Sequence, residues 1–277
     1  MSPKPETDMR RREFLGVLSG AAAAWPIAAR AQQPAMPVIG FLNVASAKEF
    51  APQVTNFHKG LAEAGYDEGR NLAIEYRWAD GQYAKLAQLA SELVRRPVAV
   101  LVATGGLGAS LAAKQATAAI PIVFNLGSDP VRYGLVASLS RPGGNITGVS
   151  FQINELVAKQ LDVLAQLMPA AKVIAFLVNP DNPNTENDTR EIKSAADRLG
   201  LRILPFSART TADLDATLPL ISPQEAAALM VSSDPFFVAQ HAHIAELATR
   251  QHMPAMFGYR QGPSRGCPGE LRSQQRR

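Results

Sequence analysis

The chain has 277 residues, 47% of them hydrophobic and 19% charged, which is ordinary for a globular protein and enough for two modest lobes or one large domain. Its net charge of +4 comes from the two ends: residues 32–259 carry 18 basic and 20 acidic side chains. The composition therefore gives no support for a nucleic-acid-binding face on the folded part. The single cysteine, Cys267, excludes a disulfide framework and a cysteine-based metal site.

Residues 1–31 have the features of an export signal. Arg10-Arg11-Arg12-Glu13-Phe14-Leu15 is followed by an uncharged, alanine-rich stretch, and Ala29-Arg30-Ala31 offers small residues where a signal peptidase cleaves. Consecutive arginines before Phe-Leu are typical of a twin-arginine signal peptide, so we expect a periplasmic protein. The alternative is an amphipathic or disordered start. A linker rich in Gln and Pro, residues 32–36, follows, and no later run approaches the ~20 apolar residues of a membrane span.

From residue 37 the chain alternates short apolar runs with segments of helical periodicity. The predicted strands are 38–42, 72–78, 98–103, 121–124 and 146–151, and the predicted helices are 54–64, 83–94, 107–117 and 131–140. This is a βαβαβαβαβ order. It predicts an N-terminal lobe at residues 37–150.

A second alternating series follows. Its predicted helices are 155–167, 187–199, 211–218 and 238–250, and its predicted strands are 172–178, 202–206, 227–231 and 254–257. It predicts a C-terminal lobe at residues 151–260. Alternation of this kind indicates an α/β protein with two Rossmann-like, doubly wound parallel sheets. Residues 261–277 break the pattern, and their basic, Gly/Pro-containing composition predicts a disordered tail.

Polar residues follow several of the predicted strands. In open parallel sheets ligands bind outside the carboxyl ends of the strands, near helix N-termini that favour anionic groups. The candidates of the first lobe are Asn43, Ser46, Thr104, Gly105, Asn125, Ser128 and Asp129, and those of the second are Asn179, Ser207, Ser232, Ser233 and Asp234. Neutral donors combined with two acids suit a small zwitterion, whose carboxylate takes N–H and O–H donors while its ammonium takes a carboxylate.

Each of these residues also has a structural interpretation. Ser, Thr, Asp and Asn are preferred helix N-caps, and Asp-Pro puts proline at the first helical position, so Asp129 and Asp234 could be caps only. Recurrence favours a functional role, because the sequence Ser-Asp-Pro stands at equivalent strand ends in the two lobes, at 128–130 and 233–235.

Support for catalysis or a cofactor is weak. The stretch 104–110, TGGLGAS, lacks the Gly-Lys-Ser/Thr of a phosphate loop, although it could present N–H groups to a carboxylate. His241 and His243 are two residues apart on a predicted helix and cannot readily share a metal. There is no G-x-S-x-G elbow. We therefore predict a non-enzymatic protein with no cofactor and no metal.

Three stretches carry a resemblance to a known family: GLAEAGYDEGRNLAIEYRWADG at 60–81, IPIVFNLGSDPVRYGLVASLSRPGGNITGVS at 120–150, and LMVSSDPFF at 229–237. Over residues 37–260 the chain resembles the type I periplasmic substrate-binding proteins of ABC transporters. The resemblance implies two Rossmann-like lobes joined by a hinge, a ligand between them, and closure that an ABC permease in the membrane recognises.

The resemblance also implies a ligand site. The positions that match ligand-facing loops are Asn43, Ser46, Thr104, Gly105, Asp129, Asn179 and Asp234. Members with assigned ligands resemble binders of aromatic or branched amino acids, so the resemblance implies an amino acid as the small-molecule ligand. Asp129 or Asp234 would hold its ammonium, and Thr104 with Gly105 its carboxylate.

The end of the chain departs from the family pattern. Family members continue past the equivalent of 258–260 with a segment that returns to the first lobe, so the tail implies a truncated or frameshifted C-terminal part. The alternatives to a solute receptor are a sensor or regulator lobe of the same fold, an α/β enzyme acting on a nucleotide-like substrate, and a non-functional remnant.

Overall fold

The computed structural model describes residues 36–151 and 156–258. By internal contacts the chain separates into residues 1–37 and 38–277, and the helices and strands of the described residues belong to the second unit. The predicted signal peptide, most of the predicted linker and the predicted tail lie outside the described residues, so they stay predictions. No helix in the described ranges combines the length and the hydrophobicity needed to cross a membrane.

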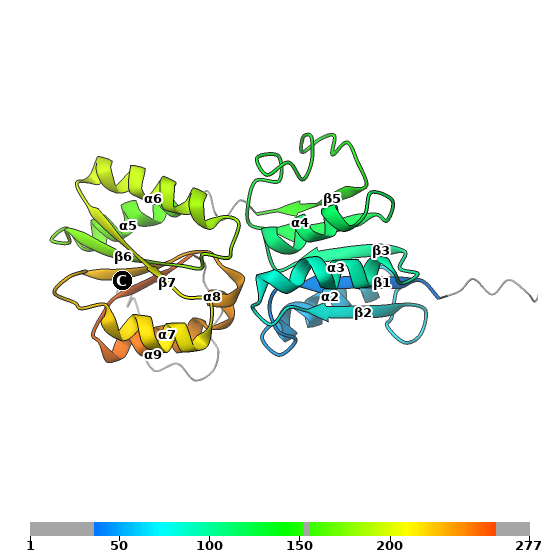
Figure 1. Cartoon of the computed structure of the whole chain (residues 1–277), viewed down its shortest axis with the longest axis horizontal. Coiled ribbons are helices and arrows are strands. Elements are labelled where there is room, and N and C mark those ends of the chain that lie inside the picture. The colour runs from blue at the N-terminus through cyan, green and yellow to red at the C-terminus, as the bar shows by residue number, and fades with distance from the viewer. Residues whose placement is uncertain (1–35, 152–155, 259–277) are drawn as a thin grey trace, which may run out of the picture. The chain divides into compact units, whose positions relative to one another are not determined.

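Five parallel strands form the first sheet, in the order β2-β1-β3-β4-β5 (Figure 1). The strands are β1 (Val38–Asn43), β2 (Ala73–Trp78), β3 (Val100–Thr104), β4 (Ile122–Leu126) and β5 (Ile146–Ser150). The strand order reverses between β1 and β3. Such a switch point is where open parallel sheets bind their ligands, because the connections from the two strands leave on opposite faces.

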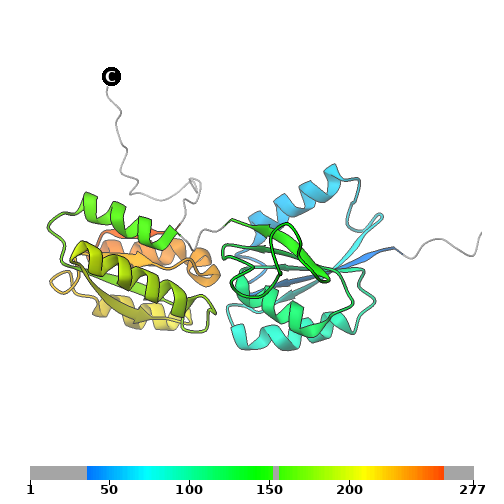
Figure 2. The same ribbon diagram turned by 90° about the horizontal axis from the view of Figure 1, so that it is seen from above.

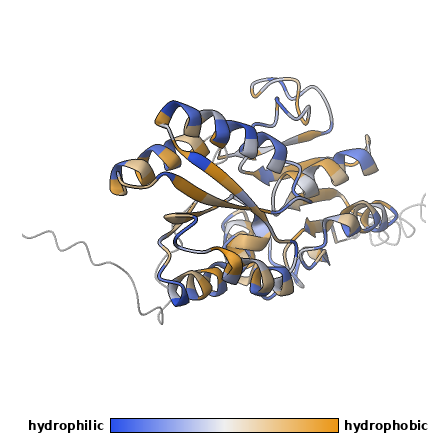
Figure 3. Cartoon of the chain, turned by 60° about the vertical axis from the view of Figure 1, so that its left-hand side comes forward, coloured by the Kyte–Doolittle hydropathy of each residue, from blue (hydrophilic) through white to orange (hydrophobic). Residues whose placement is uncertain are grey.

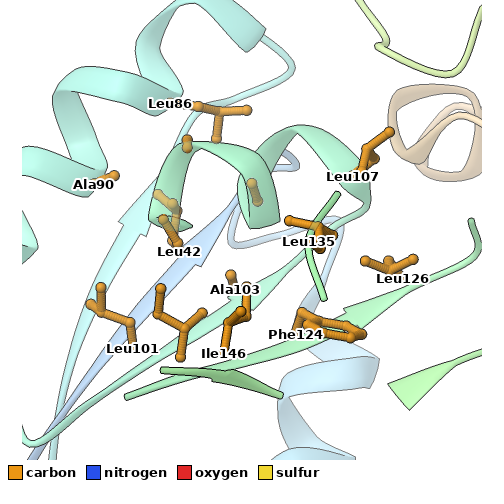
Figure 4. Packing of buried hydrophobic residues seen from close by; sticks show 14 of the residues in the cluster. Leu42, Leu86, Ala90, Leu101, Ala103, Leu107, Phe124, Leu126, Leu135 and Ile146 are labelled. Atoms are coloured by element: carbon orange, nitrogen blue, oxygen red, sulfur yellow. The ribbon is translucent and has the colours of Figure 1, made fainter. Parts of the chain in front are cut away.

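Helices cover both faces of this sheet. They are α2 (Ala51–Glu63), the 3-10 turn η1 (Tyr83–Lys85), α3 (Leu86–Val94) and α4 (Leu107–Ala116). Figure 2 shows α2 on one side of the strands and α3 with α4 on the other. The core on the α3–α4 side includes Leu42, Leu101 and Phe124, all at most 4% exposed (Figure 4).

The second sheet repeats the arrangement with four parallel strands in the order β7-β6-β8-β9. Its strands are β6 (Val173–Val178), β7 (Arg202–Ser207), β8 (Ala228–Val231) and β9 (Ala255–Phe257), and its helices are α5 (Val157–Leu167), α6 (Thr185–Leu199), α7 (Thr211–Thr217), the 3-10 turn η3 (Leu218–Leu220), α8 (Pro235–Ala239) and α9 (His241–Arg250). Figure 1 shows α5 and α6 on one side of the sheet and α7 and α9 on the other.

The hydropathy of the chain explains this layering. The central strands β1, β6 and β8 are buried on both faces and are almost continuously apolar, as parallel strands between two helical layers must be. The helices carry a polar and an apolar side, which Figure 3 shows as alternating blue and orange along each coil. The predicted α/β class with two parallel, doubly wound sheets is confirmed, and the predicted hinge stays a prediction because residues 152–155 are not described.

The predicted helix at 131–140 is wrong. This segment forms turns, because Gly134 adopts a left-handed conformation at φ 64° and the Pro130 carbonyl accepts a hydrogen bond from the Leu135 N–H at 2.8 Å instead of closing a helical turn. The apolar spacing had a different cause: Leu135 and Val136 are buried in the core of the first lobe.

The predicted helix at 238–250 is two helices. The chain enters α8 at Pro235, where proline is well tolerated as the first helical residue, and breaks at Gln240, whose φ of −90° and ψ of 11° are not helical. The other predicted helices and strands are present, with ends that differ by one to three residues; Glu155, the predicted start of α5, lies outside the described residues. Helix ends are where local sequence signals are weakest.

Gly148 on β5 makes a test of the sheet's packing. A Cβ atom there would lie 2.2 Å from the Phe124 carbonyl oxygen on the paired strand β4. We expect Gly148→Ala to lower the free energy of unfolding by about 1–3 kcal/mol, measured by urea denaturation, because the backbone must move to admit the methyl group.

Gly144→Ala is the matched control, since a Cβ at Gly144 would meet nothing within 4 Å. Its unfolding free energy should stay within about 0.5 kcal/mol of the wild type. Equal losses in the two variants would contradict the close β4–β5 pairing.

Candidate ligand-binding site

Asn43 ties together the two strands at the switch point of the first sheet. It ends β1 and is fully buried. Its Oδ1 accepts a hydrogen bond from the Ala45 N–H at 2.7 Å, and its Nδ2 donates to Oγ1 of Thr104 at the end of β3, at 2.8 Å. Asn side chains commonly stabilise turns in this way. Asn43 therefore holds the turn after β1 against the end of β3.

Asn179 has the same role in the second sheet. It follows β6, is fully buried, and accepts a hydrogen bond from the Asp181 N–H at 3.1 Å. Its Nδ2 lies 3.4 Å from Oδ1 of Asp234, which follows β8. Each sheet thus uses a buried asparagine to join the turn after its first strand to its third strand, at the strand's last residue in the first sheet and in the loop after the strand in the second.

Asp234 receives four hydrogen bonds and is completely buried. It is the N-cap of α8, and its Oδ1 accepts from the Phe236 N–H at 2.9 Å and from Asn179. Its Oδ2 accepts from Asn182 Nδ2 and from the Tyr83 hydroxyl, each at 2.8 Å. Tyr83 belongs to η1 of the first lobe, so this carboxylate connects the loops of both sheets.

Burial is the main cause of the shifted pKa values of Asp234 and Tyr83. Desolvation raises the pKa of Asp234 above the ordinary carboxyl value, and the hydrogen bonds from Tyr83, Asn182, Asn179 and the Phe236 N–H partly oppose it. Desolvation, followed by the nearby Asp234 carboxylate, raises the pKa of Tyr83 well above 10.0. The Tyr83 hydroxyl therefore keeps its proton and remains a donor.

Four further hydrogen bonds connect residues around the first sheet with residues around the second. Asn184 Nδ2 donates to Ser128 Oγ at 2.5 Å, and Gln240 Nε2 donates to Glu49 Oε1 at 2.8 Å. Arg132 donates to Glu191 Oε1 at 2.8 Å and to the side-chain Oδ1 of Asn187. Of the residues in these bonds, Glu49, Ser128 and Asn184 line a cavity.

The cavity has a volume of about 950 Å³ and is lined by loops that follow strands of both sheets. The lining residues that carry polar side chains are Glu49, Gln53, Asn56, Thr104, Asn125, Ser128, Asn182, Asn184 and Ser233. Phe41, Phe50, Phe57 and Phe151 add aromatic surface. A cavity of this size, with apolar walls and a few polar groups, suits a small organic ligand.

The charge in the cavity is confined to one group. Among the described lining residues, Glu49 is the only ionisable side chain. Its Oε2 accepts from Ser46 Oγ at 2.7 Å, and its Oε1 accepts from Gln240, so the carboxylate is held in place. A fixed carboxylate can pair with a ligand cation.

A helix N-terminus also meets the cavity. Gly105, Gly106 and Leu107 line it where β3 turns into α4, and the N-cap Gly106 has no side chain to cap the helix. Gly105 and Gly106 have φ angles of 80° and 98°, and a Cβ on Gly105 would lie 2.4 Å from Asn43 Oδ1, so only glycine fits there. The first N–H groups of α4 favour an anionic partner.

The seven predicted site residues fall into two groups. Thr104 and Gly105 line the cavity. Asn43, Asn179 and Asp234 do not line the cavity but form buried hydrogen bonds next to the strand ends. Ser46 donates a hydrogen bond that orients Glu49. Asp129 is half-buried outside the lining and accepts a hydrogen bond from the Val131 N–H at 2.8 Å, so it stabilises a turn.

Sequence reasoning missed most of the lining. Glu49, Phe50 and Phe57 belong to α2 and the turn before it, and strand ends gave no indication of them. The spacing of Phe50, Val54 and Phe57 on one helical face was the available signal, but it equally predicts core packing. These side chains do pack in part against the aromatic cluster around Phe41, 5.4 Å from Phe57 between ring centroids.

Within the described residues, no group of three or more His, Cys, Asp and Glu could hold a metal ion. His243 instead pairs with Asp215 at 2.7 Å, and the ring of His241 lies 4.0 Å from that of Phe257. The two histidines therefore have separate structural partners.

Two parallel α/β sheets whose loops enclose a cavity with a few fixed polar groups define a small-molecule-binding protein. A profile of the family described as ABC transporter substrate binding protein matches residues 39–274. The chain belongs to this family of substrate-binding proteins, which are not enzymes.

A curated relative is the tyrosine-binding protein of Clostridioides difficile strain R20291. It is 27% identical over 199 residues, which are 72% of this chain and 56% of the relative. The chain therefore spans little more than half the length of that protein.

Two solved structures share the fold. One is an ABC domain in complex with L-Trp from Streptococcus pneumonia, with a TM-score of 0.68, 24% identity, and coverage of 80% of this chain and 73% of that one. The other is a conserved domain protein from Vibrio cholerae O1 biovar eltor, with a TM-score of 0.70, 24% identity, and coverage of 80% and 74%. At this identity the likeness establishes the type I periplasmic-binding fold.

The raised pKa of Asp234 predicts a dependence of stability on pH. The folded state keeps a proton that the unfolded state releases above about pH 3.8, so this contribution is complete below that pH and is lost as the pH rises through the folded pKa. Asp234→Asn removes it. Measured by urea denaturation from pH 3.8 upward, the unfolding free energy of the variant minus that of the wild type should increase with pH.

Asp213→Asn is a control whose pKa shift has the opposite direction, so the difference in unfolding free energy should stay nearly constant from pH 3.8 upward. Asp213 completes the capping box of α7, and the hydrogen bond from the Arg209 N–H is the main cause that lowers its pKa. Its stabilising contribution is present above pH 3.8 and is lost as the pH falls. A constant or decreasing difference for Asp234→Asn would show that burial does not control this carboxyl group.

Proposed function

We propose that the protein is an exported solute receptor that binds an amino acid, preferably one with an aromatic side chain, and delivers it to an ABC permease. The observation that carries this proposal is the cavity, which combines a helix N-terminus, one fixed carboxylate and phenylalanine rings. An amino acid offers the complementary groups: a carboxylate, an ammonium and a side chain.

Each group of the ligand has a partner in the proposed complex. The ligand carboxylate takes the N–H groups at the start of α4 and the Thr104 hydroxyl. Glu49 takes the ammonium, because it is the ionisable group among the described lining residues, whereas Asp234 already has four donors. Phe50 and Phe57 supply surface for the side chain.

Binding is coupled to closure in this proposal. Residues 37–150 and 151–260 act as two lobes, and the ligand contacts both only when the loops after β1, β3, β6 and β8 are together. A ligand that binds the closed form better shifts the population toward it. The closed form is then the one that the permease subunits recognise.

Several observations support the aromatic ligand and the export. The curated relative is named for tyrosine binding and one structural neighbour holds L-Trp. The arginine run and alanine-rich stretch of residues 1–31 support export by the twin-arginine route to the periplasm.

Thermal unfolding with added ligands tests this function. L-Tyrosine, L-tryptophan or L-phenylalanine should raise the unfolding temperature, since a ligand at a hundred times its Kd stabilises by about 2.7 kcal/mol. Glu49→Gln should weaken that binding about tenfold or more, because the ammonium loses a charged partner. Glu63→Gln, an exposed change at the end of α2, is the control and should bind as the wild type does.

The same experiment includes nucleosides and sugars, and chromatography of the mixtures after incubation. Stabilisation by sugars or nucleosides alone would contradict the amino-acid ligand. Chemical conversion of any added compound would contradict the receptor function itself.

A further inference from the structure

Asn184 has an unusual position at the start of α6. It is 4% exposed, lines the cavity, and holds one side of it through the bond from its Nδ2 to Ser128 Oγ at 2.5 Å. Its backbone N–H donates to Asn182 Oδ1 at 2.9 Å. The amide is thus fixed at its nitrogen end by the first lobe and at its backbone by the second.

The oxygen end of this amide makes no hydrogen bond within residues 36–151 and 156–258. Among the described residues, no donor reaches the Oδ1 atom of Asn184, although that atom is buried. An asparagine at the N-cap normally accepts a bond from the first turn of its helix, but Asn184 has helical angles, φ −80° and ψ −19°, and makes no such bond. Buried side-chain oxygens are nearly always paired.

The neighbouring asparagines show what a structural amide does here. Asn182 uses both ends, accepting from the Asn184 N–H and donating to Asp234. Asn43 also uses both ends. Asn184 differs from them because its side-chain oxygen is buried without a partner among the described residues, in a residue that lines the cavity.

We propose that Asn184 is a specificity-determining residue whose Oδ1 accepts a hydrogen bond from an N–H or O–H group of the ligand. This rests on the proposed function. A site with a buried acceptor discriminates against an isosteric ligand that lacks the donor, because the acceptor is then left unpaired. The site therefore selects ligands that carry a donor at this point, either the ammonium or a side-chain hydroxyl.

Asn184 also makes this selection depend on closure. Ser128, which receives its Nδ2, follows β4, and its carbonyl accepts from the Ser150 hydroxyl at 2.6 Å. The amide is oriented only while this loop and the start of α6 are in contact. A ligand donor that pairs with Oδ1 thus stabilises the closed arrangement specifically.

Calorimetric titration of the full chain with three probes tests the proposal. The probes are L-tyrosine, L-phenylalanine, which lacks the hydroxyl, and 3-(4-hydroxyphenyl)propanoate, which lacks the ammonium. The wild type should lose about tenfold or more in affinity on removal of the donor that faces Asn184. In Asn184→Leu this loss should shrink to about threefold or less, whereas Asn184→Asp, which keeps an acceptor, should preserve the discrimination.

Asn71→Leu is the matched control. Asn71 is not among the residues that line the cavity, and both ends of its amide are bonded within a surface loop, to the Asp67 N–H and the Gly65 carbonyl. This variant should discriminate as the wild type does. Full discrimination in Asn184→Leu would overturn the proposal. Loss of discrimination in Asn184→Asp would also overturn it, because the ligand would then need the amide N–H.

A wild type that binds none of the probes would contradict the proposal of an aromatic amino-acid ligand. In that case the unfolding temperatures of ligand-free variants test whether the Oδ1 atom of Asn184 has a structural partner. Ser128→Ala removes the partner of its Nδ2, so adding Asn184→Leu should not lower the unfolding temperature further if Oδ1 has no structural partner. Asn71→Leu should lower it. A further decrease in the double variant would overturn the proposal.

Discussion

The buried carboxylate of Asp234 is the constraint on which the rest of the site depends. A carboxylate removed from water must be compensated by donors, and here they come from Tyr83 in the first lobe and from Asn179, Asn182 and the α8 backbone in the second. Separating the two sets of loops would take the Tyr83 hydroxyl away. The residues that enclose the cavity are therefore positioned by a group that does not line it.

The same hydrogen-bonding arrangement of a buried asparagine occurs in both sheets. A buried asparagine at the end of the first strand, Asn43 or Asn179, stabilises its own turn and bonds to the last residue of the third strand or to the loop after it. The partner differs: Thr104 faces the cavity, whereas Asp234 connects the lobes. The same arrangement thus supports a cavity-lining residue in the first sheet and a contact between the loops of the two sheets in the second.

The fold could be predicted because buried parallel strands are continuous apolar runs and each is followed by a periodic helix. Prediction failed at 131–140, where the left-handed Gly134 ends helical geometry although the apolar spacing continues. The site residues were harder to predict, because polar residues at strand ends form buried hydrogen bonds between loops as often as they line the cavity. The Tyr83–Asp234 bond joins residues 151 positions apart, and Glu49 and Phe57 enter the site from α2 and the turn before it, so only the packed structure brings them together.

The central claim is that the Tyr83–Asp234 bond holds the loops of the two sheets together. Small-angle X-ray scattering of the ligand-free wild type and of Tyr83→Phe tests it directly, with Tyr66→Phe, an exposed change, beside them. Loss of a hydrogen bond to a buried carboxylate, about 1.5–3 kcal/mol, should shift the population toward separated lobes and increase the radius of gyration of Tyr83→Phe alone. Identical radii for all three proteins would contradict the account.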